Sequence, residues 1–318
     1  METVYNISFF TFNNLTILLA FFIIMKILIG ISSKKYSEPT LDVGMRIASI
    51  LNSSTTILDV GEKINEFSYK DVSIANELME SWDLDRPGVD VLEWAYNYLQ
   101  KENYITKSSN DIGFSKNLLV DKGNGRSEVF LKGSAVKNLS LILRNGDIIE
   151  ELKDEVQSFN YDLTIIGGSG KRSMAHDLVQ YIDSSIFVVN NFNRKQTYRI
   201  LLAVDESKGN KRAVKFAVRV AQAFNIEVDI VSISNEERFS ENSHSYSHRA
   251  EKMMRRTGVK SKVRFVKGDL VDTLLDVAGN NHIIIMGRSS QSPLSKFFLG
   301  SKPLAVMESC NCPIVIVK

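Results

Sequence analysis

Short apolar runs alternate with longer segments of helical periodicity along most of the chain. Residues 26–31 form an apolar run that leads through a polar loop into residues 32–51, where apolar residues recur at helical spacing. The apolar runs do not alternate with polar residues. Such continuous runs are typical of strands that are buried on both faces of a parallel sheet. Strands of this kind alternating with helices predict the α/β class, with about five parallel strands in each half of the chain.

The pattern repeats. Residues 26–51 align without a gap with residues 199–224, and the same register carries the strand expected at 55–60 onto 228–233. Later in each half an Asp follows a glycine turn and precedes a helical pattern, so we expect Asp147 and Asp269 to cap or begin a helix. The chain is therefore predicted to hold two copies of one domain.

The repeat sets the domain boundaries. We expect a hydrophobic N-terminal extension over residues 1–24, a first domain over 25–192 and a second over 198–318, joined by a polar linker. Residues 105–138 have no equivalent in the second half, and we interpret them as an inserted hairpin or loop of unknown role.

The extension is apolar over most of residues 15–24. It lacks a small-residue cleavage site and has no basic residue before the apolar run, which disfavours a cleaved secretory peptide. Three interpretations stay open: an extension that folding does not need, a membrane contact through residues 9–24, or a helix that binds a partner.

Composition narrows the function classes. Lys and Arg number 39 against 37 Asp and Glu, so the net charge of +2 predicts no general attraction to nucleic acid. The only cysteines, Cys310 and Cys312, fit a reduced, cytoplasmic protein and are interpreted as small buried hydrophobic residues. His244 and His248 lack nearby partners for a metal, and no nucleophile set indicates an enzyme.

The stretch from Gly287 to Ser301 carries the candidate chemistry. It runs from an expected strand to a helix, and glycines, serine hydroxyls and the amides of a helix start are suited to a phosphate. Asp205, at the end of the first strand of the same half, is expected at the same edge of the sheet.

Here the second half resembles the universal stress protein family. The nucleotide loop of that family reads Gly, two residues, Gly, nine residues, Gly and then Ser or Thr. The spacing is retained here, with Ser290 in place of the second glycine. Other matching stretches are Ala203-Val-Asp205, Gly268-Asp269 and the terminal Cys312-Pro-Ile-Val-Ile-Val317, so the resemblance covers nearly all of residues 198–318.

The resemblance implies two tandem five-stranded parallel open sheets flanked by helices, of the Rossmann-like adenine nucleotide alpha hydrolase type. It also implies ATP or AMP as ligand, with Mg conceivable beside ATP, and dimerisation through the last strand. The residues that the resemblance assigns to the nucleotide are Ala203, Asp205, Ile233, Met286, Gly287, Ser290, Gly300 and Ser301.

Two departures matter. If the position of Ser290 needs a positive φ or room beside a phosphate, its Cβ lowers affinity. In the first half Ser32 stands where Asp205 stands, and Gly167–Gly170 run almost directly into a helical pattern, so this copy is expected to be degenerate.

The expected function is that of a non-enzymatic, nucleotide-binding stress-response or regulatory protein whose two domains form an internal pseudo-dimer. The alternative is a membrane-tethered or transporter-associated cytoplasmic regulatory module that has lost nucleotide binding. A slow ATPase is a third class, and pairing of two chains through their last strands stays open.

Overall fold

The computed structural model describes residues 25–62, 88–105, 120–123, 126–131, 138–168, 177–179, 181–206, 209–288 and 302–318. The interpretations placed on residues 1–24 and the predicted phosphate contacts at Ser290, Gly300 and Ser301 lie outside these described residues.

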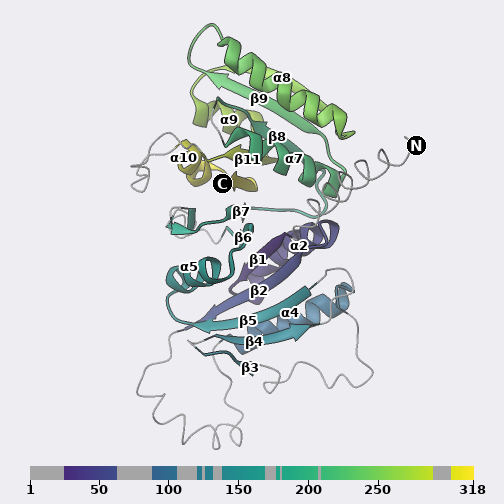
Figure 1. Ribbon diagram of the computed structural model, residues 1–318, viewed down its shortest axis with the longest axis vertical. Helices are drawn as coiled ribbons and strands as arrows, with labels where there is room; N and C mark the ends of the chain where they lie inside the picture. Colours follow the sequence, from purple (N-terminus) through teal and green to yellow (C-terminus); the bar gives the residue numbers. More distant parts are fainter. Residues whose placement is uncertain are drawn as a thin grey trace, which may run out of the picture.

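The described strands form one twelve-stranded sheet in the order β10-β9-β8-β11-β12-β7-β6-β1-β2-β5-β4-β3 (Figure 1). In the first half the strands are β1 (Lys26–Ile31), β2 (Ser54–Gly61), β3 (Val120–Asp121), β4 (Ser127–Leu131), β5 (Asn138–Asn145), β6 (Leu163–Gly167) and β7 (Ser185–Val189). In the second half they are β8 (Arg199–Ala203), β9 (Val228–Ser234), β10 (Ser261–Lys267), β11 (His282–Gly287) and β12 (Ile314–Val317).

Helices cover both faces of this sheet. On one face lie α2 (Lys34–Ile50), α4 (Val89–Lys101), α7 (Asn210–Phe224) and α8 (Glu241–Arg256), and on the other lie α5 (Ile148–Phe159), α9 (Leu270–Ala278) and α10 (Lys302–Ser309). Successive residues of a strand point into two different apolar layers, one on each face of the sheet. Leu202 lies in the layer on the α7 face, and Leu201 lies in the layer on the α9 face. The predicted α/β class with helices on both faces is confirmed.

The two halves repeat one strand order. Five parallel strands run β7-β6-β1-β2-β5 in the first half and β12-β11-β8-β9-β10 in the second. The expectation of two separate sheets needs one refinement, because β12 pairs antiparallel with β7 and joins them. Each half would otherwise expose the unpaired backbone groups of its last strand, and their pairing satisfies both edges.

Of the two positions expected for Asp147 and Asp269, capping or beginning a helix, both residues take the N-cap. The Asp147 carboxylate accepts from the amides of Ile149 and Glu150 at 3.0 and 3.1 Å, at the start of α5. The Asp269 carboxylate accepts from the amides of Val271 and Asp272 at 2.8 and 3.3 Å, at the start of α9. Each cap satisfies donors that the first helical turn leaves without a partner.

The inserted stretch contributes a hairpin at the outer edge of the first half. There β3 pairs antiparallel with β4, and β4 pairs antiparallel with β5. Arg126, just before β4, is 9% exposed and its guanidinium Nε lies 3.2 Å from the carboxylate of Glu155 on α5. The insertion is therefore attached to the domain by a buried ion pair as well as by the sheet.

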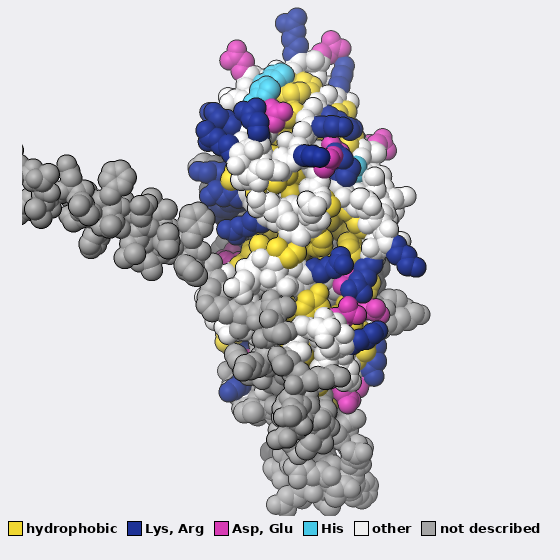
Figure 2. Space-filling model, turned by 90° about the vertical axis from the view of Figure 1, so that its right-hand side faces the viewer, with side chains coloured by type: hydrophobic (Ala, Val, Ile, Leu, Met, Phe, Trp, Pro, Cys, Tyr) yellow, Lys and Arg dark blue, Asp and Glu magenta, His cyan; other side chains and the backbone are white. Residues whose placement is uncertain are grey.

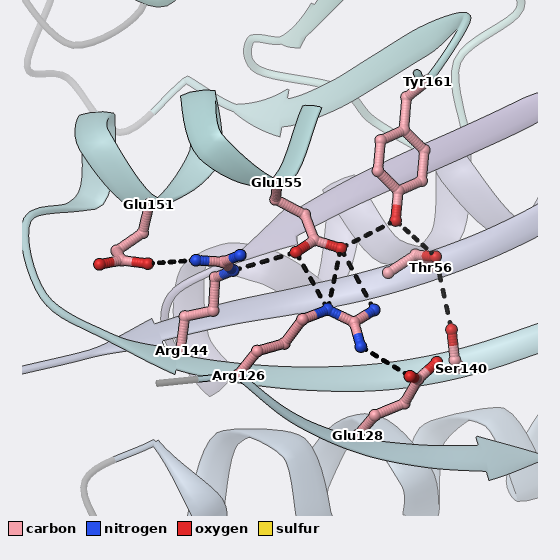
Figure 3. A network of polar contacts seen from close by, with 8 residues as sticks. All are labelled: Thr56, Arg126, Glu128, Ser140, Arg144, Glu151, Glu155 and Tyr161. Carbon is pink, nitrogen blue, oxygen red and sulfur yellow. Dashed lines mark hydrogen bonds and ion pairs between the residues drawn. The ribbon is translucent and has the colours of Figure 1, made fainter. Parts of the chain in front are cut away.

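Glu155 is the centre of a buried polar network (Figure 3). Its side chain is fully buried, and its carboxylate also accepts from Arg144 Nε at 3.0 Å and lies 3.1 Å from the Tyr161 hydroxyl. The same hydroxyl lies 2.9 Å from Thr56 Oγ1, so the network reaches β2. Burial, and then the negative charge of Glu155, raise the pKa of Tyr161 above its ordinary range.

The two cysteines precede β12 rather than lying in it. Cys310 and Cys312 are free thiols, 6% and 4% exposed, with their sulfur atoms 2.8 Å apart. Their side chains belong to the apolar layer under α10, in keeping with the packing role expected of them. Among the helices of the described ranges, none combines the length and apolar character needed to cross a bilayer.

Candidate functional site at the carboxyl ends of β8 and β11

A crevice is expected where β8 and β11 lie side by side. Strand β8 has β9, the next strand along the chain, on one side and β11 on the other side. Ala203 on β8 lies opposite Met286 on β11. Strand order reverses at this point, and in open parallel sheets ligands bind beyond the carboxyl ends of the strands there.

Three predicted lining residues share one face at this edge. Ala203 on β8, Ile233 on β9 and Met286 on β11 all pack on the apolar layer under α9 and α10. The strands are neighbours in the order β9-β8-β11. The structure therefore brings these three apolar side chains to adjacent strands, on the same face, as a flat hydrophobic group would require.

Another predicted site residue, Gly287, lies at the end of β11 and packs against the start of α7. A Cβ at Gly287 would lie 2.7 Å from the carbonyl carbon of Gly209, so a larger residue would force the two backbones apart. A Cβ at Gly209 would in turn collide with the carbonyl oxygen of Arg288. Glycine at both positions allows the first turn of α7 to approach the end of β11.

Sequence reasoning missed Asn210, the first residue of α7. It is 3% exposed, and its side-chain Nδ2 donates to the carbonyl oxygen of Asp205 at 2.9 Å. Its Oδ1 atom is buried and has no hydrogen-bond partner among the described residues. Because leaving a buried acceptor unpaired is costly, this oxygen indicates a donor from outside the described residues. Only the tertiary structure shows that Asn210 is buried and that its Oδ1 atom lacks a partner within the described ranges.

The start of α7 adds amide donors. Its N-cap residue is Gly209, whose lack of a side chain leaves the first helical amides without a side-chain cap. Amides at a helix start favour negatively charged groups. Asp205 lies two residues beyond β8 and is exposed, and its carbonyl oxygen accepts from Asn210 at the start of α7.

The neighbouring carboxylate serves a different purpose. Glu206 accepts hydrogen bonds from the hydroxyls of Ser240 and Ser243 at the start of α8. The bond from Ser240, followed by that from Ser243, holds the pKa of Glu206 below its ordinary value. Glu206 therefore links the loop after β8 to α8.

The equivalent edge of the first half is built differently. Ser32 occupies the position of Asp205, and the backbone amides of Ser32 and Ser33 donate to the Ser37 hydroxyl at 2.9 and 3.2 Å. A Cβ at Gly168, after β6, would collide with the side chain of Asn190. The amides of Ser32 and Ser33 are thus satisfied within the protein.

A buried acid also lies at this edge of the first half. Asp59, near the end of β2, is 2% exposed and packs beside Gly88 at the start of α4. Burial, and then the charge of Asp90, raise the pKa of Asp59 to about 7. In the described parts of the chain no cluster of three or more His, Cys, Asp or Glu side chains is arranged to hold a metal.

The strand order and the flanking helices are those of open parallel α/β proteins, which bind ligands at the switch point. The sequence model of the universal stress protein family matches residues 197–318. A universal stress protein of Methanocaldococcus jannaschii is 22% identical over 153 residues, which cover 42% of this chain and 90% of that protein. Residues 197–318 of the chain thus match the universal stress protein family.

Solved structures extend the likeness to both halves. A universal stress protein from Archaeoglobus fulgidus has a TM-score of 0.57 at 14% identity, covering 92% of this chain and 96% of its own. The cytoplasmic domain of a prokaryotic cation chloride cotransporter has a TM-score of 0.50 at 10% identity, covering 92% and 95%. At these identities the likeness concerns the fold alone.

Proposed function

We propose that an adenine nucleotide such as ATP or AMP binds beyond the carboxyl ends of β8 and β11, and that the protein responds to it by binding rather than by turnover. The observation that carries the proposal is the buried Oδ1 of Asn210 at the start of α7, which has no hydrogen-bond partner within the described ranges. A ligand with a hydrogen-bond donor and an anionic group satisfies both features.

The remaining residues have complementary roles in this proposal. Ala203, Ile233 and Met286 provide an apolar surface for the base, and the Asp205 carboxylate accepts from ribose hydroxyls or the adenine amino group. Gly287 allows the start of α7, with its amides, to lie against the end of β11. The phosphates, with Mg when ATP binds, are assigned to Ser290, Gly300 and Ser301 by the family resemblance.

The test is calorimetric titration of the full chain with ATP and with AMP. We expect saturable binding of one nucleotide per chain, lost in Asp205→Ala, Asn210→Leu and Gly300→Val. Ser32→Ala, which changes the equivalent of Asp205 in the first half, is the matched control and should bind as the parent does. Absence of binding to either nucleotide, or equal loss in the control, overturns the proposal.

Turnover is measured on the same samples. A binding module should release no ADP beyond one equivalent per chain when ATP is in excess. Continuous ADP release, abolished by Asp205→Ala, would assign the protein to the ATP-consuming class instead.

A further inference from the structure

The two cysteines form a close thiol pair outside the proposed nucleotide site. Cys310 follows the last turn of α10, and its amide donates to the carbonyl oxygen of Val306 at 2.8 Å. Cys312 comes two residues later, shortly before β12, and the two sulfur atoms lie 2.8 Å apart. Packed core atoms are about 3.5 to 4.0 Å apart, and the sulfur atoms of a disulfide about 2.05 Å. The thiols are thus closer than packing requires and need to approach by less than about 1 Å to form a bond.

Hydrogen bonds make the two sulfur atoms different. The Cys310 sulfur accepts from the amide of Cys312 at 3.3 Å, and the neutral Cys310 thiol donates to the Cys312 carbonyl oxygen at 3.2 Å. The hydrogen bond from the Cys312 thiol lowers the pKa of Cys310, whereas the same contact, and then burial, raise the pKa of Cys312. Because the thiolate is the reactive form, Cys310 is the nucleophile of the pair and Cys312 the resolving thiol.

The turn that holds the pair also contacts the first half of the chain. The side-chain amides of Asn190 and Asn191, which follow β7, donate to the carbonyl oxygens of Cys310 and Asn311 at 3.4 and 3.0 Å. Figure 2 shows hydrophobic side chains at mid-height, the level at which Figure 1 places β7, between regions where charged side chains gather. A rearrangement of this turn therefore acts on the strand pair β7–β12, through which the two halves join.

The pair lies directly beneath the protein surface. Both cysteine side chains are buried, whereas Ser309 and Asn311, their neighbours in the chain, are exposed. A local opening of the turn admits a small oxidant but hinders a bulky thiol reagent.

A disulfide at this position suits a reversible role better than a structural one. Only one residue separates the two cysteines, so the bond closes a very short loop and constrains the unfolded chain little. The small ring strains the bond, and strained disulfides are the ones that are readily reduced.

We propose that Cys310 and Cys312 form a redox site that hydroperoxides oxidise to an intrachain disulfide, and that this bond loosens the β7–β12 junction. The Cys310 sulfur attacks an oxygen of hydrogen peroxide, the O–O bond breaks, and a sulfenic acid forms with release of water. The Cys312 sulfur then attacks the Cys310 sulfur, and the sulfenic oxygen leaves as a second water. Two thiols lose two electrons and two protons to one peroxide. The proposal is independent of nucleotide binding, since it gives no role to Asp205 or Asn210.

The experiment oxidises the reduced full chain with hydrogen peroxide under native conditions. The protein is then unfolded in urea with N-ethylmaleimide, and its intact mass is measured. We expect two maleimide groups on the reduced chain and none on the oxidised chain, with both thiols restored by dithiothreitol. Peptide mapping should locate the bond between Cys310 and Cys312 of one chain and separate it from methionine oxidation.

Single serine variants test the two assigned roles. Cys312→Ser should stop at a sulfenic acid on Cys310, which dimedone traps, because the resolving thiol is gone. Cys310→Ser should leave Cys312 largely reduced, with oxidation slower by about tenfold or more. Circular dichroism checks that each variant is folded, and the mass measurement on the parent chain stands without them. Equal dimedone labelling of the two variants would contradict the assignment.

Hydrogen exchange measures the effect on the junction. Closing the bond moves the turn carbonyls away from Asn190 and Asn191, so the amides of β7 and β12 should exchange faster, by about threefold or more, in the oxidised protein. Strand β10, at the far end of the sheet order, is the internal control and should not change. The double variant Cys310→Ser with Cys312→Ser, treated with peroxide, should exchange as its untreated form does.

Three results would overturn the proposal. Two free thiols after native peroxide treatment, with a disulfide forming only in urea, would leave the cysteines with packing alone. Bonds between chains instead of within one chain would remove the paired site. An intrachain disulfide that leaves the exchange of β7 and β12 unchanged would show that the junction does not respond to it.

Discussion

Val315 lies directly opposite Phe187 in the antiparallel pair of β12 and β7, and both side chains are fully buried. The family resemblance implies dimerisation through the last strand, and here the last strands of the two halves pair with each other inside one chain. The outer edge at the second half is β10, whose exposed Lys262, Arg264 and Lys267 disfavour pairing with another strand.

Truncating the aromatic residue at this junction should destabilise the protein. Phe187→Ala removes a fully buried ring between the two halves, and we expect a loss of about 3 to 5 kcal/mol in the free energy of unfolding. Urea denaturation followed by circular dichroism measures it. Ile50→Ala, at a side chain that is 51% exposed, should change stability by less than about 0.5 kcal/mol. Equal effects would contradict the assigned role of Phe187.

Neutralising the buried carboxylate of the polar network should also be costly. Glu155→Gln keeps the shape of the side chain but leaves Arg126 and Arg144 without their shared charge partner, and we expect a loss of about 3 to 5 kcal/mol. The neighbouring exposed residue gives the control, Asp154→Asn, which should be close to neutral. A stable Glu155→Gln variant would mean that the ion pairs contribute little beyond packing.

Asp59 should make stability depend on pH in an unusual direction. Its folded pKa of about 7 is above the ordinary value of 3.8, so the folded state holds a proton that the unfolded chain releases. Stability from this group is therefore fully present below about pH 4 and is lost as the pH rises through about 7.

Replacing Asp59 with Asn should remove that dependence. We expect Asp59→Asn to match the parent near pH 4 and to be more stable near pH 8, by about 4 kcal/mol, because each pKa unit corresponds to about 1.4 kcal/mol. Thermal or urea unfolding across this range measures the difference. Asp276→Asn, at an exposed position on α9, is the control and should show no such trend. A constant difference at all pH values would refute the explanation.

The two helix caps should contribute equally. Asp147→Ala and Asp269→Ala each remove a carboxylate that accepts from two helical amides, and each should cost about 1 kcal/mol of stability. The Asn variants at the same positions retain a capping oxygen and should lose much less. Denaturation midpoints compare all four variants, and a loss that Asn does not restore would argue against capping.

Much of the architecture could be predicted because it rests on local patterns. The offset between residues 26–51 and 199–224 gives the repeat, apolar runs give the parallel strands, and Gly-Asp pairs give the caps. The period of two along a strand also places Ala203 and Met286 on one face once β8 and β11 are neighbours. The apolar runs, the caps and the period of two each depend on residues that are close together in the sequence.

What the sequence by itself determined is thus the class of fold, the two copies and the half whose sequence matches the universal stress protein family. Only the tertiary structure decided which polar groups meet: Arg126 with Glu155 across the insertion, and Asn210 with Asp205 at the crevice. It also decided that β7 pairs with β12, making one sheet of two. The physical reason is that a hydrogen bond or ion pair depends on the position of both partners, whereas the identity of either residue alone fits many partners.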